Sequence, residues 1–96
     1  MNELQNNNLI GRVVISKAGR DMDEIYIIVN NVDENYVLVA NGSTKTIEMP
    51  KKKKLKHMML TNVIDEEIKS SILSQDKNTN LKIKRFIKLN GTVKEV

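Results

Sequence analysis

Lysine is the residue that this chain concentrates most strongly, and it does so in one short stretch. Residues 42–60 carry six lysines against one acidic residue, a formal charge of +5, whereas the whole 96-residue chain carries +4. The candidate contacts for an anionic partner are Lys45, Lys51, Lys52, Lys53, Lys54, Lys56 and His57. Clustered cations bind nucleic-acid phosphates because each neutralised phosphate releases a condensed counterion. The stretch therefore predicts a phosphate-rich partner, with a solvated linker as the alternative.

A second group of cations lies nearer the N-terminus, and consists of Arg12, Lys17 and Arg20. An arginine can donate a planar fork of hydrogen bonds to a phosphate or stack on a base. A surface arginine paired with Asp21 is an equally weighted alternative. Tyr26 and Tyr36 could stack on bases, as aromatic residues do in proteins that bind single strands. Because aromatic residues make up only 3% of the chain, we expect both to pack in the core or at its rim.

Residues suited to catalysis or metal binding are scarce. The chain has no cysteine, and His57 is its one histidine, so a convergent set of nitrogen or sulfur ligands is not available. The acidic run at residues 65–67 is ordinary for the first turn of a helix. No phosphate-cradling glycine loop and no nucleophile motif is present. The sequence predicts a protein that is not an enzyme and needs neither a metal nor a cofactor.

Three sequence features bear on the cellular compartment. The lack of cysteine fits a reducing environment. Residues 1–8 are polar and lack the cationic start and apolar run of a secretion signal. The longest apolar run, residues 25–29, is far shorter than a membrane span. We therefore expect a cytoplasmic protein without a membrane partner.

Short runs of β-branched and aromatic residues predict three strands, at residues 11–17, 25–29 and 36–40, and two further strands are expected at residues 45–49 and, after the lysine run, 55–60. The pair Asn41 and Gly42 predicts a hairpin before the fourth strand, and Pro50 ends that strand or places it at an edge. Alternation predicts one shared core made of Val13, Ile15, Ile25, Ile27, Val29, Val37 and Val39. Five short strands in so few residues indicate a small barrel or a sandwich.

The pattern changes after residue 61. Asn62 or Asp65 is a candidate cap for a helix whose apolar positions are Ile64, Ile68, Ile72 and Leu73. A loop over residues 74–79 would precede a second helix over about residues 80–89, with Leu81, Phe86 and Ile87 on its apolar face. Gly91 is expected to end that helix. The sequence thus predicts a helical C-terminal part.

Residues 11–21 (GRVVISKAGRD), followed by the strands at 25–29 and 36–40, resemble a KOW motif. The chain is similar to the small bacterial KOW-domain RNA-binding proteins, which are related to large-subunit ribosomal proteins of the fourteen-e type. Residues 49–57 (MPKKKKLKH) extend this resemblance. It covers residues 9–61.

The resemblance implies an SH3-like barrel, five-stranded and mainly β, over residues 9–61. A flexible N-terminus (1–8) would precede it, and a helical appendage (62–96) would follow. It also implies a non-catalytic role in translation, in which the barrel binds ribosomal or other structured RNA, with ribosomal proteins as further potential partners. One departure stands out: Met22 and Asp23 occupy positions where the motif usually has a lysine and a glycine. Asp is among the better substitutes for glycine at a positive φ, so the fold is expected to tolerate it.

Two other functions remain open on the sequence. SH3-like folds also bind peptides, so the lysine stretch could meet an acidic protein partner instead. A regulator that dimerises through residues 62–90 is the third alternative. The sequence sets no oligomeric state.

Overall fold

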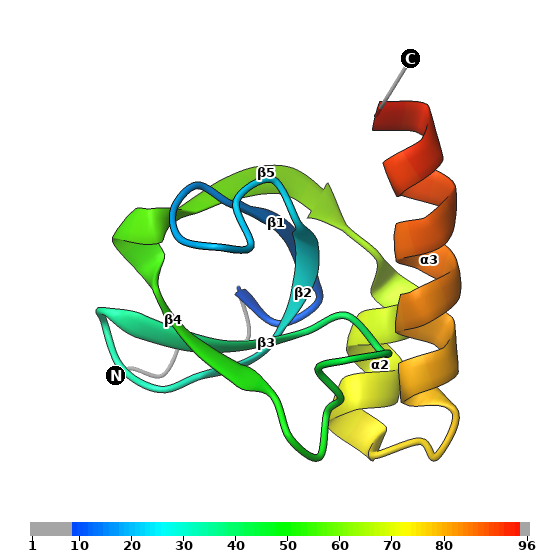
Figure 1. Ribbon diagram of the computed structural model, residues 1–96. Coiled ribbons are helices and arrows are strands. Elements are labelled where there is room, and N and C mark those ends of the chain that lie inside the picture. The colour runs from blue at the N-terminus through cyan, green and yellow to red at the C-terminus, as the bar shows by residue number, and fades with distance from the viewer. Residues whose placement is uncertain (1–8, 95–96) are drawn as a thin grey trace.

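The computed structural model describes residues 9–94, which form a five-stranded antiparallel sheet followed by two helices. The strands and helices are β1 (Arg12–Ser16), β2 (Ile25–Asn31), β3 (Tyr36–Ala40), β4 (Lys51–Lys54), β5 (Met58–Ile64), α2 (Glu66–Ser74) and α3 (Thr79–Lys94). The strand order β4-β3-β2-β1-β5 makes β4 and β5 the two edges of the sheet. The sheet is curled, and both helices lie against its outer side (Figure 1). The mainly β architecture with a helical C-terminal part is confirmed.

The first three strands lie where the sequence predicts them. Their β-branched and aromatic residues suit a pleated, half-buried backbone, and two antiparallel hairpins join them in chain order. Val13 lies opposite Ile27 in the first hairpin, and Ile28 lies opposite Val39 in the second. A bulge between Ile28 and Asn30 shifts the second register, as bulges do where a strand bends.

The prediction of a fourth strand at residues 45–49 is wrong, because the lysine run itself forms β4. Residues 41–49 instead form a loop that side-chain hydrogen bonds hold in place near its start and near its end. The Asn41 carboxamide oxygen accepts hydrogen bonds from the backbone of Ser43 and Lys45, both at 2.9 Å. The backbone N–H of Ile47 donates to the Asn80 side chain of α3 at 2.9 Å. These contacts with a distant helix override the β-branched composition of the segment.

The fifth strand also begins later than its predicted range of 55–60. A single 3-10 turn, η1 (Leu55–His57), comes first and carries the chain from β4 to β5. Two backbone hydrogen bonds fix this turn, from Leu55 N–H to the Asn35 carbonyl and from Lys17 N–H to the His57 carbonyl, each 2.8 Å. The turn therefore joins the two edges of the curled sheet at one end.

Both faces of the sheet are covered, which corrects the prediction of one shared core. The inner cluster, inside the curl, consists of Val14, Tyr26, Ile28, Val37, Val39 and Met58. The outer cluster joins the sheet to the helices and consists of Val13, Ile27, Val29, Ala40, Ile68 and Ile83. Each predicted core residue of β1 to β3 is thus buried or packed against a cluster, with the exception of Ile15, which is only half-buried. Strands without polar alternation are typical of sheets buried on both sides.

The first helix begins as predicted at one of its two candidate caps. The Asp65 carboxylate accepts a hydrogen bond from the Ile68 backbone at 2.9 Å, and Gln75 ends α2 in a left-handed conformation. Ile68 is buried, whereas Leu73, predicted on the apolar face, is exposed.

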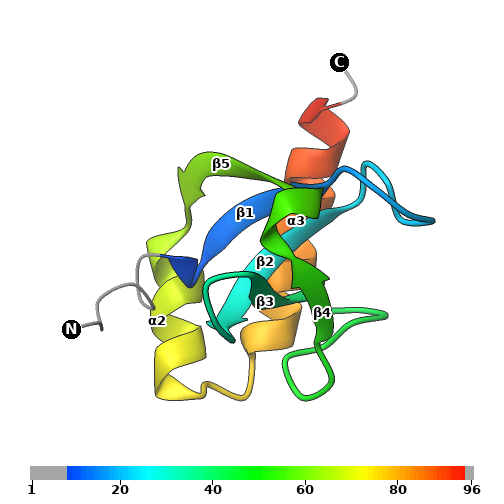
Figure 2. The same cartoon turned by 90° about the vertical axis from the view of Figure 1, so that its left-hand side faces the viewer.

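The second helix is longer than predicted and continues through Gly91 to Lys94. It runs behind the sheet in the view of Figure 2. Ile83 and Thr79 of this helix are fully buried, whereas Leu81, predicted on the apolar face, is exposed. Gly42 lies against α3 so closely that an added Cβ atom would collide with the Asn80 carbonyl. The helix is therefore docked tightly against the loop after β3.

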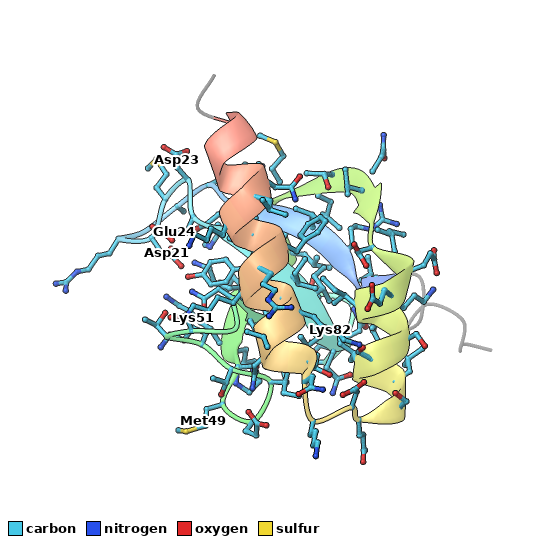
Figure 3. All side chains as sticks on the ribbon, turned by 90° about the vertical axis from the view of Figure 1, so that its right-hand side faces the viewer. Asp21, Asp23, Glu24, Met49, Lys51 and Lys82 are labelled. Atoms are coloured by element: carbon cyan, nitrogen blue, oxygen red, sulfur yellow. The ribbon has the colours of Figure 1, made fainter. Side chains whose placement is uncertain are left out.

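A cluster of four polar side chains joins the two helices. The Lys82 ammonium donates to the Ser71 hydroxyl at 2.9 Å and pairs with the carboxylates of Asp76 and Glu67 at 3.4 and 3.5 Å. Figure 3 places Lys82 between α2 and α3. The expected domain boundary after residue 61 falls inside β5, and the expected flexible N-terminus, residues 1–8, lies outside the described residues.

Candidate nucleic-acid interface

The pleat of β4 divides the lysine run into two pairs. β4 is antiparallel to β3, with Val39 opposite Lys51 and Val37 opposite Lys53. Directly opposed residues point to the same side of a sheet, so these two lysines share the inner face with the buried valines. Lys52 and Lys54 point to the outer face, and both are exposed. Four identical residues in a row therefore occupy two different environments.

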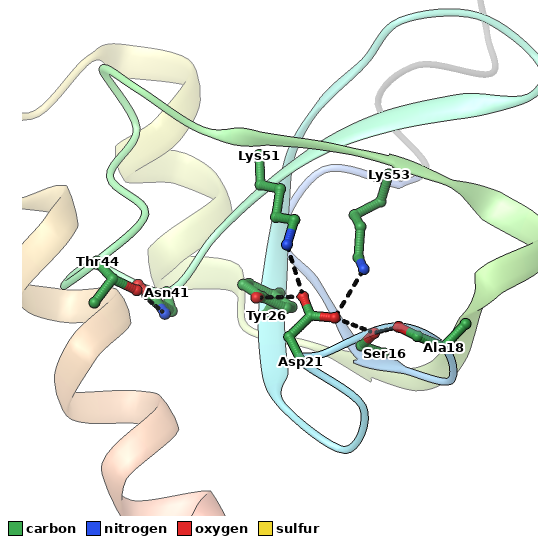
Figure 4. A network of polar contacts seen from close by, with 8 residues as sticks. All are labelled: Ser16, Ala18, Asp21, Tyr26, Asn41, Thr44, Lys51 and Lys53. Atoms are coloured by element: carbon green, nitrogen blue, oxygen red, sulfur yellow. Dashed lines mark hydrogen bonds and ion pairs between the residues drawn. The ribbon is translucent and has the colours of Figure 1, made fainter.

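The inner pair of lysines converges on Asp21 (Figure 4). The Lys53 ammonium lies 3.0 Å from Oδ1 of Asp21, and the Lys51 ammonium lies 3.2 Å from Oδ2. The Tyr26 hydroxyl donates to Oδ2 at 2.7 Å, and the Ser16 hydroxyl lies 3.0 Å from Oδ1. A carboxylate has about four acceptor positions, and here each oxygen has two neighbouring donor groups, with the one Ser16 proton shared between Oδ1 and the Ala18 carbonyl, also at 3.0 Å. The Asp21 side chain is 14% exposed, so this saturated contact lies mostly out of water.

The β1–β2 loop positions Asp21 by folding back over the curl. The backbone N–H of Asp23 donates to the Ser16 carbonyl at 2.8 Å, and that of Glu24 donates to the Asp21 carbonyl at 2.9 Å. Gly19 and Asp23 both have positive φ, +87° and +76°. The expectation that Asp23 replaces glycine in a left-handed backbone is therefore confirmed, because Asp tolerates this region better than most residues.

The contacts of Asp21 shift its own pKa and that of Tyr26. Burial alone raises the pKa of Asp21, but the hydrogen bonds from Tyr26, Lys53, Ser16 and Lys51 outweigh it, so the pKa lies well below its usual range. Burial, and then the hydrogen bond to the anionic Asp21, raise the pKa of Tyr26 well above its usual value. Asp21 is thus held as an anion, which the two nearby ammonium groups stabilise, and Tyr26 stays a neutral phenol that donates a hydrogen bond to the carboxylate.

The outer pair of lysines lies beside an aromatic ring and a hollow. The Lys52 ammonium sits 4.6 Å from the centroid of the Tyr36 ring, within the range of a cation–π contact. A hollow of about 370 Å³ opens next to this ring, and it is lined by Asn35, Tyr36, Lys54, Leu55 and Lys56. Two exposed lysines, Lys54 and Lys56, therefore line one partly apolar depression at the edge of the sheet, and the exposed Lys52 lies over the ring of Tyr36, which also lines it.

The other predicted cations differ in their distance from the hollow next to Tyr36. Lys17 and His57 meet through their backbones at the end of η1, beside Lys56. Arg20 is exposed in the β1–β2 loop. Arg12 lies on β1 and donates to the Thr61 carbonyl of β5 at 2.8 Å, which commits its guanidinium to the opposite edge of the sheet.

Lys45 is also removed from the hollow. It lies half-buried in the loop that packs against α3, and its carbonyl accepts hydrogen bonds from Asn41 and Gly42 at 2.8 and 2.9 Å. The candidate surface that remains consists of Asn35, Tyr36, Lys52, Lys54, Leu55 and Lys56, hereafter the outer lysine surface.

Sequence reasoning missed two members of these arrangements. The sequence indicates Asp21 only as the last residue of the KOW-like stretch and as a surface partner for an arginine, and it does not single out Asn35. Tyr26 is buried, and this agrees with its predicted place in the core. Register was the missing signal: once residues 51–54 are recognised as a strand, alternation places two lysines beside Tyr26 and hence near the adjoining loop.

Within residues 9–94, no group of three or more His, Asp or Glu side chains is arranged to hold a metal ion. In the same residues, neither helix combines the length and the apolar composition that crossing a membrane requires.

The chain matches none of the protein families against which it was compared, and none of the curated proteins is significantly similar to it.

Proposed function

We propose that this protein is a non-catalytic RNA-binding protein of the KOW type, with an SH3-like barrel that presents the outer lysine surface to structured RNA. Ribosomal RNA, in a role in translation, is the first candidate. The observation that carries the proposal is the state of Lys52, Lys54 and Lys56. All three are exposed, and within residues 9–94 none of them forms an ion pair with an acidic side chain. Unpaired, clustered cations on a rigid strand and turn are suited to phosphates.

Edge protection offers a simpler reason for lysines at these positions. β4 is an edge strand, and exposed lysines on an edge discourage pairing with another sheet. That reason accounts for Lys52 and Lys54, but not for Lys56, which lies beyond the strand in η1. Nor does it explain the ring and the hollow next to them. The surface as a whole is therefore better explained by a ligand.

The proposal is tested by the salt dependence of binding to ribosomal RNA fragments, measured by fluorescence anisotropy from ~50 to ~200 mM salt. A triple variant carries Lys52→Ser, Lys54→Ser and Lys56→Ser. If each lysine neutralises one phosphate, the log–log slope falls by about 2–3 units. The affinity for folded RNAs of unrelated sequence should fall by a similar factor, because phosphate contacts carry no sequence information.

A matched control removes the same charge elsewhere. Lys77→Ser, Lys84→Ser and Arg85→Ser take three exposed cations from α3 and the turn before it. This variant should keep the wild-type slope. Equal losses in the two variants would show that net charge alone drives binding. Failure of the wild type to bind at the lowest salt would exclude the RNA proposal, and capture of an acidic protein by the outer lysine surface would replace it.

A further inference from the structure

The outer lysine surface contains more than cations, and its other members have a recognisable chemistry. Tyr36, Asn35 and Leu55, which carry an aromatic ring, a carboxamide and an apolar side chain, line one hollow with Lys54 and Lys56. A surface that only neutralised phosphates would need none of the first three. Bases of unpaired nucleotides are bound by stacking on aromatic rings and by hydrogen bonds to their edges.

Asn35 is held in place without using its side chain. Its backbone N–H donates to the Asp33 carboxylate at 2.8 Å, and its carbonyl accepts from Leu55 N–H at 2.8 Å. Its carboxamide is exposed and makes no hydrogen bond within the described residues. An amide can donate and accept at once, which matches the mixed edge of a nucleobase. The position is thus rigid while its hydrogen-bonding group is available.

Tyr36 is placed so that one ligand can meet its ring and the lysines together. The ring is half-buried on the outer face opposite Lys54, with the Lys52 ammonium over it at 4.6 Å. Tyr36 also lines the hollow, so part of this residue is accessible to a ligand there. The volume of about 370 Å³ lies near the lower end of the range for small-ligand sites, and it suits one nucleotide better than a stack.

We propose that this hollow binds a single unpaired nucleotide of an RNA. Its base stacks on Tyr36, its edge meets the Asn35 amide, and its phosphates lie on Lys54 and Lys56. The inference rests on the proposed RNA-binding function and adds to it a preference for loops, bulges or single strands. A paired base cannot enter the hollow, because both of its faces are already stacked within the duplex.

The test compares two RNAs of equal length, a hairpin with an unpaired loop and a fully paired duplex, by fluorescence anisotropy. The wild type should bind the hairpin more tightly. Tyr36→Leu keeps an apolar side chain but removes the aromatic face, and it should weaken hairpin binding by roughly 5- to 100-fold, the equivalent of one stacked base. Its affinity for the duplex should not change. Tyr36→Phe should retain most of the hairpin affinity, because its ring still stacks.

Asn35→Ala provides an independent measurement on hairpins that differ only in the base of the loop. It should reduce the differences in affinity among the four bases while leaving duplex binding unchanged. Thermal melts establish that each variant is folded before its affinity is interpreted.

The outcomes separate this inference from the function on which it rests. Equal wild-type affinity for the two RNAs, or an equal loss for both in Tyr36→Leu, would overturn the nucleotide site while leaving phosphate binding by the lysines intact. If the wild type binds neither RNA, both proposals fail.

Discussion

The two pairs of lysines in β4 are identical in sequence and opposite in role. Lys51 and Lys53 turn inward and share one carboxylate, whereas Lys52 and Lys54 turn outward beside a tyrosine ring. The difference comes from the pleat, which sends successive residues to opposite faces. A run of four charges is therefore two structural features rather than one binding site. Two of the four lysines in the run therefore point toward the inside of the curl, and of these Lys53 is mostly buried.

The inner pair also shows why a small sheet can hold charged residues near its core. The inner cluster is apolar, but the end nearest the β1–β2 loop contains Ser16, Tyr26 and Asp21, which satisfy one another and the lysines. Burying charges is costly unless each is paired and hydrogen-bonded, and here the carboxylate is saturated. The contact ties a loop to an edge strand 30 residues later in the chain. Within residues 9–94, the outer pair has no such carboxylate partner.

The largest expected effect comes from removing the shared carboxylate. Asp21→Ala leaves two ammonium groups and a buried phenol without their acceptor. Lys51 is 38% exposed and can turn to water, but Lys53 is 11% exposed, so we expect a loss of about 2–3 kcal/mol in the free energy of unfolding. Urea denaturation measures it. Adding Lys53→Met should restore part of the loss, because an apolar side chain needs no partner there. A loss below about 0.5 kcal/mol would mean that the lysines are solvated, as exposed ion pairs are.

The same contact predicts a specific sensitivity to acid. The folded-state pKa of Asp21 is lowered, so this group stabilises the fold above its unfolded pKa of about 3.9, and the contribution is lost as the pH falls toward the folded value. Other carboxylates also titrate there, so the informative quantity is the difference between the wild type and Asp21→Asn. That difference should be constant from about pH 5 to 7 and should shrink below about pH 4. A difference that does not depend on pH would contradict an anionic Asp21.

A direct test of the inner–outer comparison uses two neighbouring lysines. Lys53→Ala removes one of the two ammonium groups on Asp21 and should destabilise the fold by about 1–2 kcal/mol. Lys52→Ala removes an exposed cation over Tyr36 and should cost less than about 1 kcal/mol. RNA affinity should show the reverse order under the proposed function, with the larger loss in Lys52→Ala. Equal effects on stability would show that the pleat does not separate the two positions.

The strands of the fold were largely predictable, and the exceptions have a common cause. β1 to β3 are rich in β-branched and aromatic residues, so local preference and tertiary structure agree. At residues 45–54 the local preference of the residues and the tertiary structure disagree. Thr46 and Ile47 favour a strand and the lysines do not, yet the lysines pair with β3 while Ile47 turns to α3. Lysine has a low strand propensity, and here the contacts of Lys51 and Lys53 with Asp21 replace that missing preference.

Only the cationic residues of the outer lysine surface could be predicted from the sequence. Lys52, Lys54 and Lys56 could be named from clustering alone. Their separation from Lys51 and Lys53 required the register of β4 against β3, which depends on where the preceding loop ends. Asn35 carries no signal of its own, since an asparagine in a turn is ordinary. Its relevance arises from the backbone hydrogen bond with Leu55, a contact across 20 residues of chain.

The smallest expected effect concerns a second acid on the β1–β2 loop. Asp21 turns inward, whereas Asp23 is exposed and adopts a φ of +76° (Figure 3). Asp23→Gly relieves a left-handed backbone but gives the unfolded chain more freedom, so the two terms oppose each other and stability should change by less than about 1 kcal/mol. RNA affinity should be nearly unchanged if the outer lysine surface makes the contacts, whereas Asp23→Lys should raise it modestly by adding a cation nearby. Thermal melts and anisotropy measure both. A large loss of affinity in a folded Asp23→Gly variant would move the interface to the β1–β2 loop, beside Lys17 and Arg20, and would end the separation between a structural inner face and a binding outer face.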